Sequence, residues 1–172
     1  MVATSTIPPQ PPLRCARRAR AGRRAFVTVL CVFLLAGVLG MLGVRTATVR
    51  AEGGGYELEV RYARVTRPGL AVPWSVTIRH PGGFDGPVTL STTSSYFDLL
   101  DENAFEPEPE SVTTDGERVS WEFAPPGQGD TMEVSLDTRT GPNVQWGAEA
   151  VTAVLEDGRP VVEAEYRTWV LP

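Results

Sequence analysis

The feature that most constrains this chain is an uncharged stretch of twenty residues, 25–44, which directly follows a cluster of arginines. A helix rises about 1.5 Å per residue, so this stretch matches the roughly 30 Å thickness of a bilayer's hydrocarbon layer. No acidic residue precedes Glu52, and positively charged flanks stay on the cytoplasmic side. The sequence therefore predicts a single-pass signal-anchor helix over 25–44 in the plasma membrane, with a disordered basic cytoplasmic tail over 1–24. The arginines of the cluster are Arg14, Arg17, Arg18, Arg20, Arg23 and Arg24.

Two questions about this anchor stay open in the sequence. Val49-Arg50-Ala51 carries small residues where a signal peptidase would cleave after Ala51, although a cleavable signal has an apolar core of only about 7 to 15 residues. The pair Arg23-Arg24 resembles a twin-arginine export signal, whereas the strongly apolar stretch favours the general secretory route. Each route exports the same downstream domain.

The charges divide the chain into two opposed parts. Residues 1–51 carry eight arginines and no acid, whereas residues 52–172 carry eight arginines and 21 acids. An acidic exported domain repels nucleic acid, so nucleic acid is excluded as a partner, while the basic tail is expected to lie against the bilayer. Both cysteines, Cys15 and Cys31, precede the exported part, so disulfides do not hold it together.

From Tyr56 onward the apolar residues recur with a period of two, which is typical of half-buried strands. Asp157-Gly158 stands between two such stretches and is a preferred dipeptide for a two-residue hairpin turn. About seven short strands separated by turn signals indicate an all-β domain over 56–172, an antiparallel two-sheet sandwich of immunoglobulin-like type. Residues 45–55, which end in three glycines, are expected to be a linker that keeps this domain near the bilayer.

Four short motifs add a resemblance to a known group of proteins. Together with the arginine-rich tail and single helix, they resemble a family of uncharacterised actinobacterial single-pass membrane proteins with an immunoglobulin-like extracytoplasmic β-sandwich. The resemblance implies a bacterial cell envelope and carries no assigned activity. The motifs are Trp121-Glu122-Phe123, Pro125-Pro126-Gly127, Val134-Ser135-Leu136-Asp137 and Arg167-Thr168-Trp169-Val170-Leu171-Pro172.

The segment 94–110 mixes aromatic and acidic residues and is the best candidate for a functional surface. It has three interpretations: a crossover between sheets whose aromatic residues close the core, a loop that presents Tyr96 and Phe97 to a partner, or a Ca²⁺ site. Ca²⁺ takes six to eight oxygen ligands, but the spacing here matches no known calcium loop. The candidate ligands are Asp98, Asp101, Glu102, Asn103 and Glu106.

Two further features are candidates for contact with a partner protein. Ala36, Gly40 and Gly43 would place small side chains on one face of the apolar helix, where a second helix can approach closely. Trp146 lies in an irregular stretch and is the least constrained of the four tryptophans. Large aromatic residues on strands are, by contrast, usually part of the core.

Catalytic chemistry has little support in the sequence. The exported part has no cysteine and no lysine, and its single histidine, His80, stands in a Pro-Gly-Gly turn. We therefore expect no catalytic residues and no cofactor. The predicted function is an accessory subunit of a cell-envelope membrane complex. The alternative is an adhesion or ligand-binding module for Ca²⁺ or wall glycan, and a hydrolase that uses a carboxylate pair is a remote third.

Overall fold

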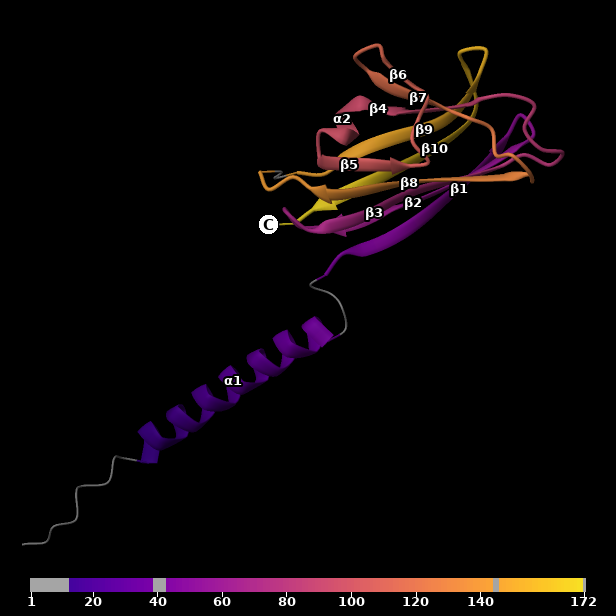
Figure 1. Ribbon diagram of the computed structural model, residues 1–172. Coiled ribbons are helices and arrows are strands. Elements are labelled where there is room, and N and C mark those ends of the chain that lie inside the picture. Colours follow the sequence, from indigo (N-terminus) through magenta and orange to yellow (C-terminus); the bar gives the residue numbers. More distant parts are fainter. Residues whose placement is uncertain (1–12, 39–42, 144–145, 172) are drawn as a thin grey trace, which may run out of the picture. The chain divides into compact units, whose positions relative to one another are not determined.

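The computed structural model describes residues 13–38, 43–143 and 146–171 and divides into two compact units, residues 1–42 and 43–172 (Figure 1). The first unit contains helix α1 (Leu13–Val38). Its segment Arg18–Val38 is long and apolar enough to cross a membrane, a property that signal sequences share. The helix begins before residue 25, so the prediction of a disordered tail is wrong from Leu13 onward. Alanine and arginine are both strong helix formers, which explains the extension.

The second unit is almost entirely β-structure, as the alternating pattern predicts. It has one short helix, α2 (Ser94–Phe97), and ten strands rather than about seven. The strands are β1 (Arg45–Gly53), β2 (Tyr56–Thr66), β3 (Ala71–Arg79), β4 (Val88–Thr93), β5 (Leu100–Glu106), β6 (Ser111–Thr114), β7 (Arg118–Phe123), β8 (Thr131–Thr140), β9 (Ala148–Glu156) and β10 (Arg159–Val170).

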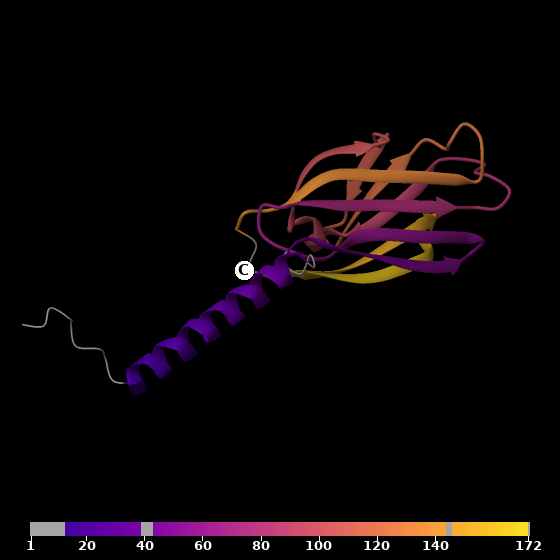
Figure 2. The same ribbon diagram turned by 90° about the horizontal axis from the view of Figure 1, so that it is seen from below.

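The ten strands form one curled sheet, a half-barrel, in the order β5-β8-β3-β2-β10-β9-β4-β7-β6, with β1 paired to β2 (Figures 1 and 2). The sheet is mixed because the end of β10 runs parallel to the end of β2, through Trp169 beside Val65 and Val170 beside Thr66. The remaining pairs are antiparallel. The expected separation into two purely antiparallel sheets is therefore not what the domain shows. Strand β10 is twelve residues long, enough to pair with β9 and still end on β2.

Residues 45–53 form a strand, so the prediction of a Gly-rich linker over 45–55 is wrong for these residues. Strand β1 pairs with β2 from Arg45 to Gly53, and its inward residues Ala47, Val49 and Ala51 pack against the core. Gly54 and Gly55 have φ values of 57° and 83°. These glycines form the tight β1–β2 turn, because glycine adopts such angles without steric cost.

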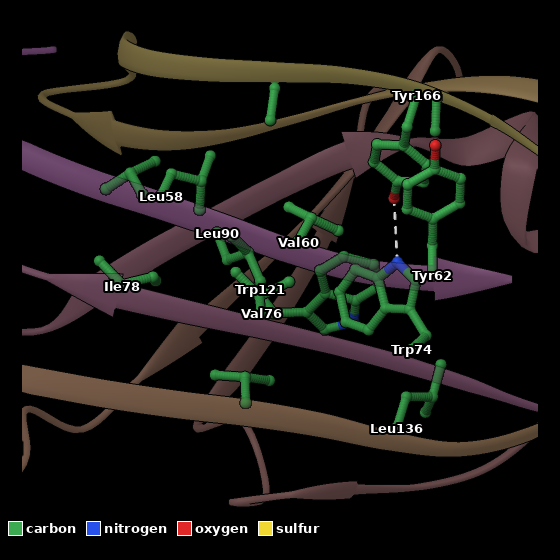
Figure 3. Packing of buried hydrophobic residues seen from close by; sticks show 14 of the residues in the cluster. Leu58, Val60, Tyr62, Trp74, Val76, Ile78, Leu90, Trp121, Leu136 and Tyr166 are labelled. Atoms are coloured by element: carbon green, nitrogen blue, oxygen red, sulfur yellow. Dashed lines mark hydrogen bonds between the residues drawn. The ribbon is translucent and has the colours of Figure 1, made fainter. Parts of the chain in front are cut away.

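The core contains polar side chains that satisfy one another (Figure 3). Trp74 Nε1 donates a hydrogen bond to Tyr166 Oη over 2.9 Å, and the same oxygen lies 2.9 Å from Thr152 Oγ1. Thr152 Oγ1 is in turn 2.9 Å from Thr92 Oγ1. Within the described residues, every buried side-chain nitrogen and oxygen has a hydrogen-bond partner. The core therefore avoids the penalty of about 1–3 kcal/mol for each unsatisfied polar group.

The predicted hairpin turn is confirmed, because β9 ends at Glu156 and β10 begins at Arg159. Asp157 and Gly158 have φ values of 50° and 75°, as a primed two-residue turn requires. A Cβ atom added to Gly158 would meet nothing within 4 Å. A larger residue at this position is therefore disfavoured only by the positive φ angle of the backbone.

We therefore expect Gly158→Ala to lower the free energy of unfolding by about 1–2 kcal/mol, the cost of a left-handed conformation for an L-residue. The measurement is urea unfolding of the full chain in detergent micelles. Gly127→Ala is the matched control, since Gly127 also has open space around it but does not adopt a positive φ. The control is expected to change stability by less than about 0.5 kcal/mol. Equal losses for both variants would contradict this account of the turn.

Candidate functional site

The segment 94–110 is a crossover that closes the core, and the prediction that Tyr96 and Phe97 contact a partner is wrong. These residues lie on α2, between β4 and β5, and only 2% and 8% of their surfaces are exposed. The Tyr96 hydroxyl lies 2.9 Å from Thr168 Oγ1. The Phe97 ring centroid lies 5.5 Å from that of Trp74 and 4.9 Å from that of Trp121. Burying large aromatic rings is favourable, which explains why these two side chains lie in the core and not on the surface.

The Ca²⁺ candidates are not brought together. Asp98, Asp101 and Glu106 are exposed, and Arg139 holds the Asp101 carboxylate at 3.4 Å. Asp101 and Glu106 stand on one extended strand, about 16 Å apart at about 3.3 Å per residue. The side chains of Glu102 and Asn103 lie outside the described residues. In the described part of the chain, no group of three or more acidic, histidine or cysteine side chains is arranged to hold a metal ion.

The small-residue stripe does not continue along one helix. Ala36 lies on α1, Gly40 lies outside the described residues, and Gly43 is in a bend before β1. Trp146 lies between β8 and β9 with 81% of its surface exposed, so it is accessible as the irregular stretch suggests. Its contact with a partner stays a prediction.

The structure reveals a site that the sequence analysis missed, a groove of about 350 Å³ where three turns of the sheet meet. It lies at the start of β2, just beyond the end of β3, and beside the β9–β10 turn. We call it the Tyr56 groove. Its aromatic and charged lining consists of Tyr56, His80, Phe84, Asp85, Glu156 and Asp157.

Three stacked or tilted rings form the aromatic part of the Tyr56 groove. The ring centroids of Tyr56 and His80 are 4.3 Å apart in a stacked arrangement, and Phe84 lies 6.5 Å from Tyr56 and 5.9 Å from His80. His80 Nδ1 lies 2.6 Å from the carbonyl oxygen of Gly83. A carbonyl oxygen only accepts, so Nδ1 carries a hydrogen and donates it, which fixes the orientation of the imidazole.

The Tyr56 hydroxyl donates a hydrogen bond to Glu156 Oε1 over 2.8 Å. Burial, with help from the carboxylates of Glu156 and Asp85, raises the pKa of Tyr56 to about 12. The phenol therefore stays neutral and keeps donating at physiological pH, which orients the Glu156 carboxylate. Asp85 and Asp157 add negative charge at the rim. Carboxylates beside aromatic faces suit a cationic group or a polyhydroxylated ring.

Comparison with protein families and with curated proteins gives no match for this chain. Sequence analysis placed His80 in a turn and Asp157 in a hairpin, but strand pairing alone brings these turns beside Tyr56, which is distant in sequence from Glu156. The sequence signal that could have pointed to this groove is local: a histidine and an aspartate each stand at the end of a strand with a glycine close by.

Proposed function

We propose that this chain is a membrane-anchored extracytoplasmic interaction domain, an accessory subunit of a cell-envelope membrane complex without catalysis of its own. Helix α1 crosses the plasma membrane once, with the arginine-rich end in the cytoplasm. The observation that carries the proposal is the Tyr56 groove, which places the carboxylates of Asp85, Glu156 and Asp157 beside aromatic rings. The groove receives a lysine or arginine side chain of the partner. The actinobacterial setting rests on motif resemblance alone, and the immunoglobulin-like relationship rests on the strand pattern of the sequence together with that resemblance.

Strand β1 supports a retained anchor. Cleavage after Ala51 would remove most of β1, including Ala47 and Val49, which pack against the core. The edge of β2 that β1 covers would then expose its backbone hydrogen-bonding groups, and an open edge of this kind invites aggregation. The domain is therefore expected to keep residues 45–51, and with them the covalent link to α1.

The cationic ligand follows from the charge balance of the groove. Asp85, Glu156 and Asp157 supply three carboxylates, and His80 is the basic side chain in the lining. A charge-assisted hydrogen bond contributes about 1.5–3 kcal/mol, so losing even one weakens binding about tenfold or more. This arrangement repels phosphate-rich ligands and attracts lysine and arginine.

The test uses the full chain in its native membrane with a photoactivatable residue in place of Pro87, which is exposed at the groove. A groove-bound envelope protein should crosslink at this position. The double variant Glu156→Gln with Asp157→Asn should lower the yield about tenfold. These changes remove charge but keep shape, because glutamine still accepts from Tyr56 and asparagine tolerates the positive φ at 157.

Glu133→Gln with Asp137→Asn is the matched control, since both residues are exposed on β8 away from the groove lining. The control variant should crosslink as the native chain does. An equal fall in both double variants would reveal a general charge effect and would contradict a groove-specific partner.

A wall glycan is the second candidate ligand, because Tyr56 and Phe84 present partly exposed rings beside carboxylates that can accept from hydroxyls. The same variants, bound in micelles to soluble wall-glycan fragments, separate the two candidates. Glycan binding that falls in the groove variant, with no protein crosslinked, would favour the binding module. If the chain binds no glycan and gives no crosslink at Pro87, both candidate functions are overturned.

A further inference from the structure

We infer that Arg45, Arg64 and Trp169 form a binding site for the phosphate head group of an anionic membrane lipid. The inference rests on the membrane anchor of the proposed function but is independent of the Tyr56 groove. The two sites occupy different parts of the domain, since Tyr56 begins β2 whereas Arg64 lies near its end.

Backbone pairing brings the three residues together at one end of the sheet. Val65 of β2 pairs with Arg45 of β1 and also with Trp169 of β10. These residues, together with Arg64 and Thr46, line an open groove of about 650 Å³. We call it the Arg45 groove. Its size suits a lipid head group, and its walls come from three strands that the fold holds in register.

The arginines of this groove are available for a ligand. In the described part of the chain, ion pairs engage five arginines, and neither Arg45 nor Arg64 has a carboxylate within 4.0 Å. Five of the ten arginines in residues 43–172 have such a pair, so Arg45 and Arg64 belong to the half that has none within the described residues, and they are the two that line one groove. Two guanidinium groups beside one groove suit phosphate oxygens, which they bind through paired N–H donors. The arginines with ion pairs are Arg50, Arg79, Arg118, Arg139 and Arg167.

Trp169 gives the groove the amphipathic wall of a membrane-interface site. The residue is 48% exposed, and the Arg167 guanidinium carbon lies 3.8 Å from the ring centroid. Tryptophan concentrates at the boundary between head groups and acyl chains, where its apolar ring and polar N–H are both satisfied. A phosphate held by arginines next to this ring reproduces that environment.

Other exposed apolar side chains lie at the same end of the domain. The Leu171 N–H donates to the Thr66 carbonyl over 2.9 Å, and Leu70 accepts from the Thr140 N–H over 2.9 Å. Trp146 precedes Gly147, whose backbone packs directly against β10: a Cβ atom added at Gly147 would lie only 1.7 Å from the Thr168 carbonyl oxygen. This contact places Trp146 beside the end of β10. Leu70, Trp146 and Leu171 are all exposed, as is Trp169. Exposed apolar side chains at the same end of the domain as two arginines favour a lipid surface over a wholly aqueous ligand.

The covalent chain keeps this end of the domain within reach of lipid. Helix α1 ends at Val38 and β1 begins at Arg45, so the connection spans at most about 25 Å even when fully extended. With α1 across the bilayer, a connection of this length lets Arg45 reach the head-group layer. A protein partner would need to displace lipid that is already present at high local concentration.

The experiment uses the full chain in lipid nanodiscs that contain brominated phosphatidylcholine, with or without phosphatidylglycerol. Bromine quenches tryptophan fluorescence at short range, and Trp74 and Trp121 are buried, so added quenching reports on Trp146 and Trp169. We expect phosphatidylglycerol to increase quenching by about twofold or more, because each arginine is attracted to an anionic surface. Arg45→Gln with Arg64→Gln should abolish this increase.

Arg61→Gln with Arg159→Gln is the control of equal charge, since both residues are exposed and lie outside the lining of the Arg45 groove. This variant should keep the increase. Trp169→Phe removes the reporter in the Arg45 groove, so most of the increase should be lost with it, whereas Trp146→Phe should keep the increase; the reverse result would place the lipid contact outside the groove. An increase that disappears equally in the control would indicate general attraction to the surface and would overturn the site.

Two further outcomes would also overturn the inference. If millimolar inorganic phosphate reverses the increase in quenching, the Arg45 groove is a site for free phosphate. If quenching does not depend on lipid charge, the groove does not bind anionic lipid and a protein partner is the remaining ligand. Resistance to carbonate extraction checks the anchor separately. A chain that is inserted but insensitive to phosphatidylglycerol contradicts only this inference, whereas a chain that is not inserted contradicts the membrane anchor as well.

Discussion

Trp74→Ala is expected to lower the free energy of unfolding by about 3–5 kcal/mol, which is the usual cost of removing a buried tryptophan. Only 2% of the Trp74 surface is exposed, and its ring centroid lies 5.5 Å from Phe97 and 6.5 Å from Trp121. The substitution creates a cavity between strands from both halves of the sheet. It also removes the indole N–H that donates to Tyr166 Oη.

The measurement for Trp74 is urea unfolding of the full chain in micelles, with Trp146→Ala as the matched control. Trp146 loses the same atoms but is largely exposed, so its replacement should change stability by less than about 0.5 kcal/mol. The slope of the transition should be the same in both variants. A similar loss for the two tryptophans would contradict the position of the core.

Stability is also expected to fall steeply between pH 10 and pH 12. Burial raises the pKa of Tyr166 to about 12, above its ordinary value of 10. A group whose pKa is raised on folding contributes stability that is complete below its unfolded pKa and disappears as the pH rises through its folded pKa. Tyr166 therefore contributes about 2–3 kcal/mol that is lost over this window. Burial raises the pKa of Tyr96 in the same direction, so the total loss is larger.

The alkaline transition can be followed by two signals, the urea midpoint at successive pH values and the phenolate absorbance near 295 nm. Tyr166→Phe is the informative variant. At pH 8 it should lose about 1–3 kcal/mol, because Trp74 Nε1 and Thr152 Oγ1 lose a shared partner. Above pH 10 its stability should fall less steeply than that of the native chain. A stability that is constant from pH 9 to pH 12 would contradict the burial of both phenols.

The two grooves suggest how the proposed functions fit on one domain. Tyr56 lies at the start of β2, and Arg64 lies eight residues further along the same strand, about 26 Å at 3.3 Å per residue. The Tyr56 groove is lined by carboxylates and the Arg45 groove by arginines, so the two proposed ligands are of opposite charge and lie at separate places. In the proposed arrangement, the Arg45 groove contacts lipid and the Tyr56 groove stays free for a partner.

Local patterns explain what could be predicted from the sequence. The apolar helix, the mostly β domain and the Asp157-Gly158 turn each depend on residues that are neighbours in the chain. The errors at the boundaries have local causes as well. Arginine and alanine extended α1 toward Leu13, and the glycines after β1 formed a turn where we expected the end of a Gly-rich linker.

The sequence by itself determined that an apolar helix precedes a domain of alternating strands, because hydrophobic length and periodicity are properties of contiguous residues. Only the tertiary structure decided that Tyr96 and Phe97 close the core, that β10 reaches β2 and curls the sheet, and where the two grooves lie. Each of these depends on pairing between segments far apart in the chain. Such pairing is chosen by the total surface that the whole domain buries, which no single segment encodes.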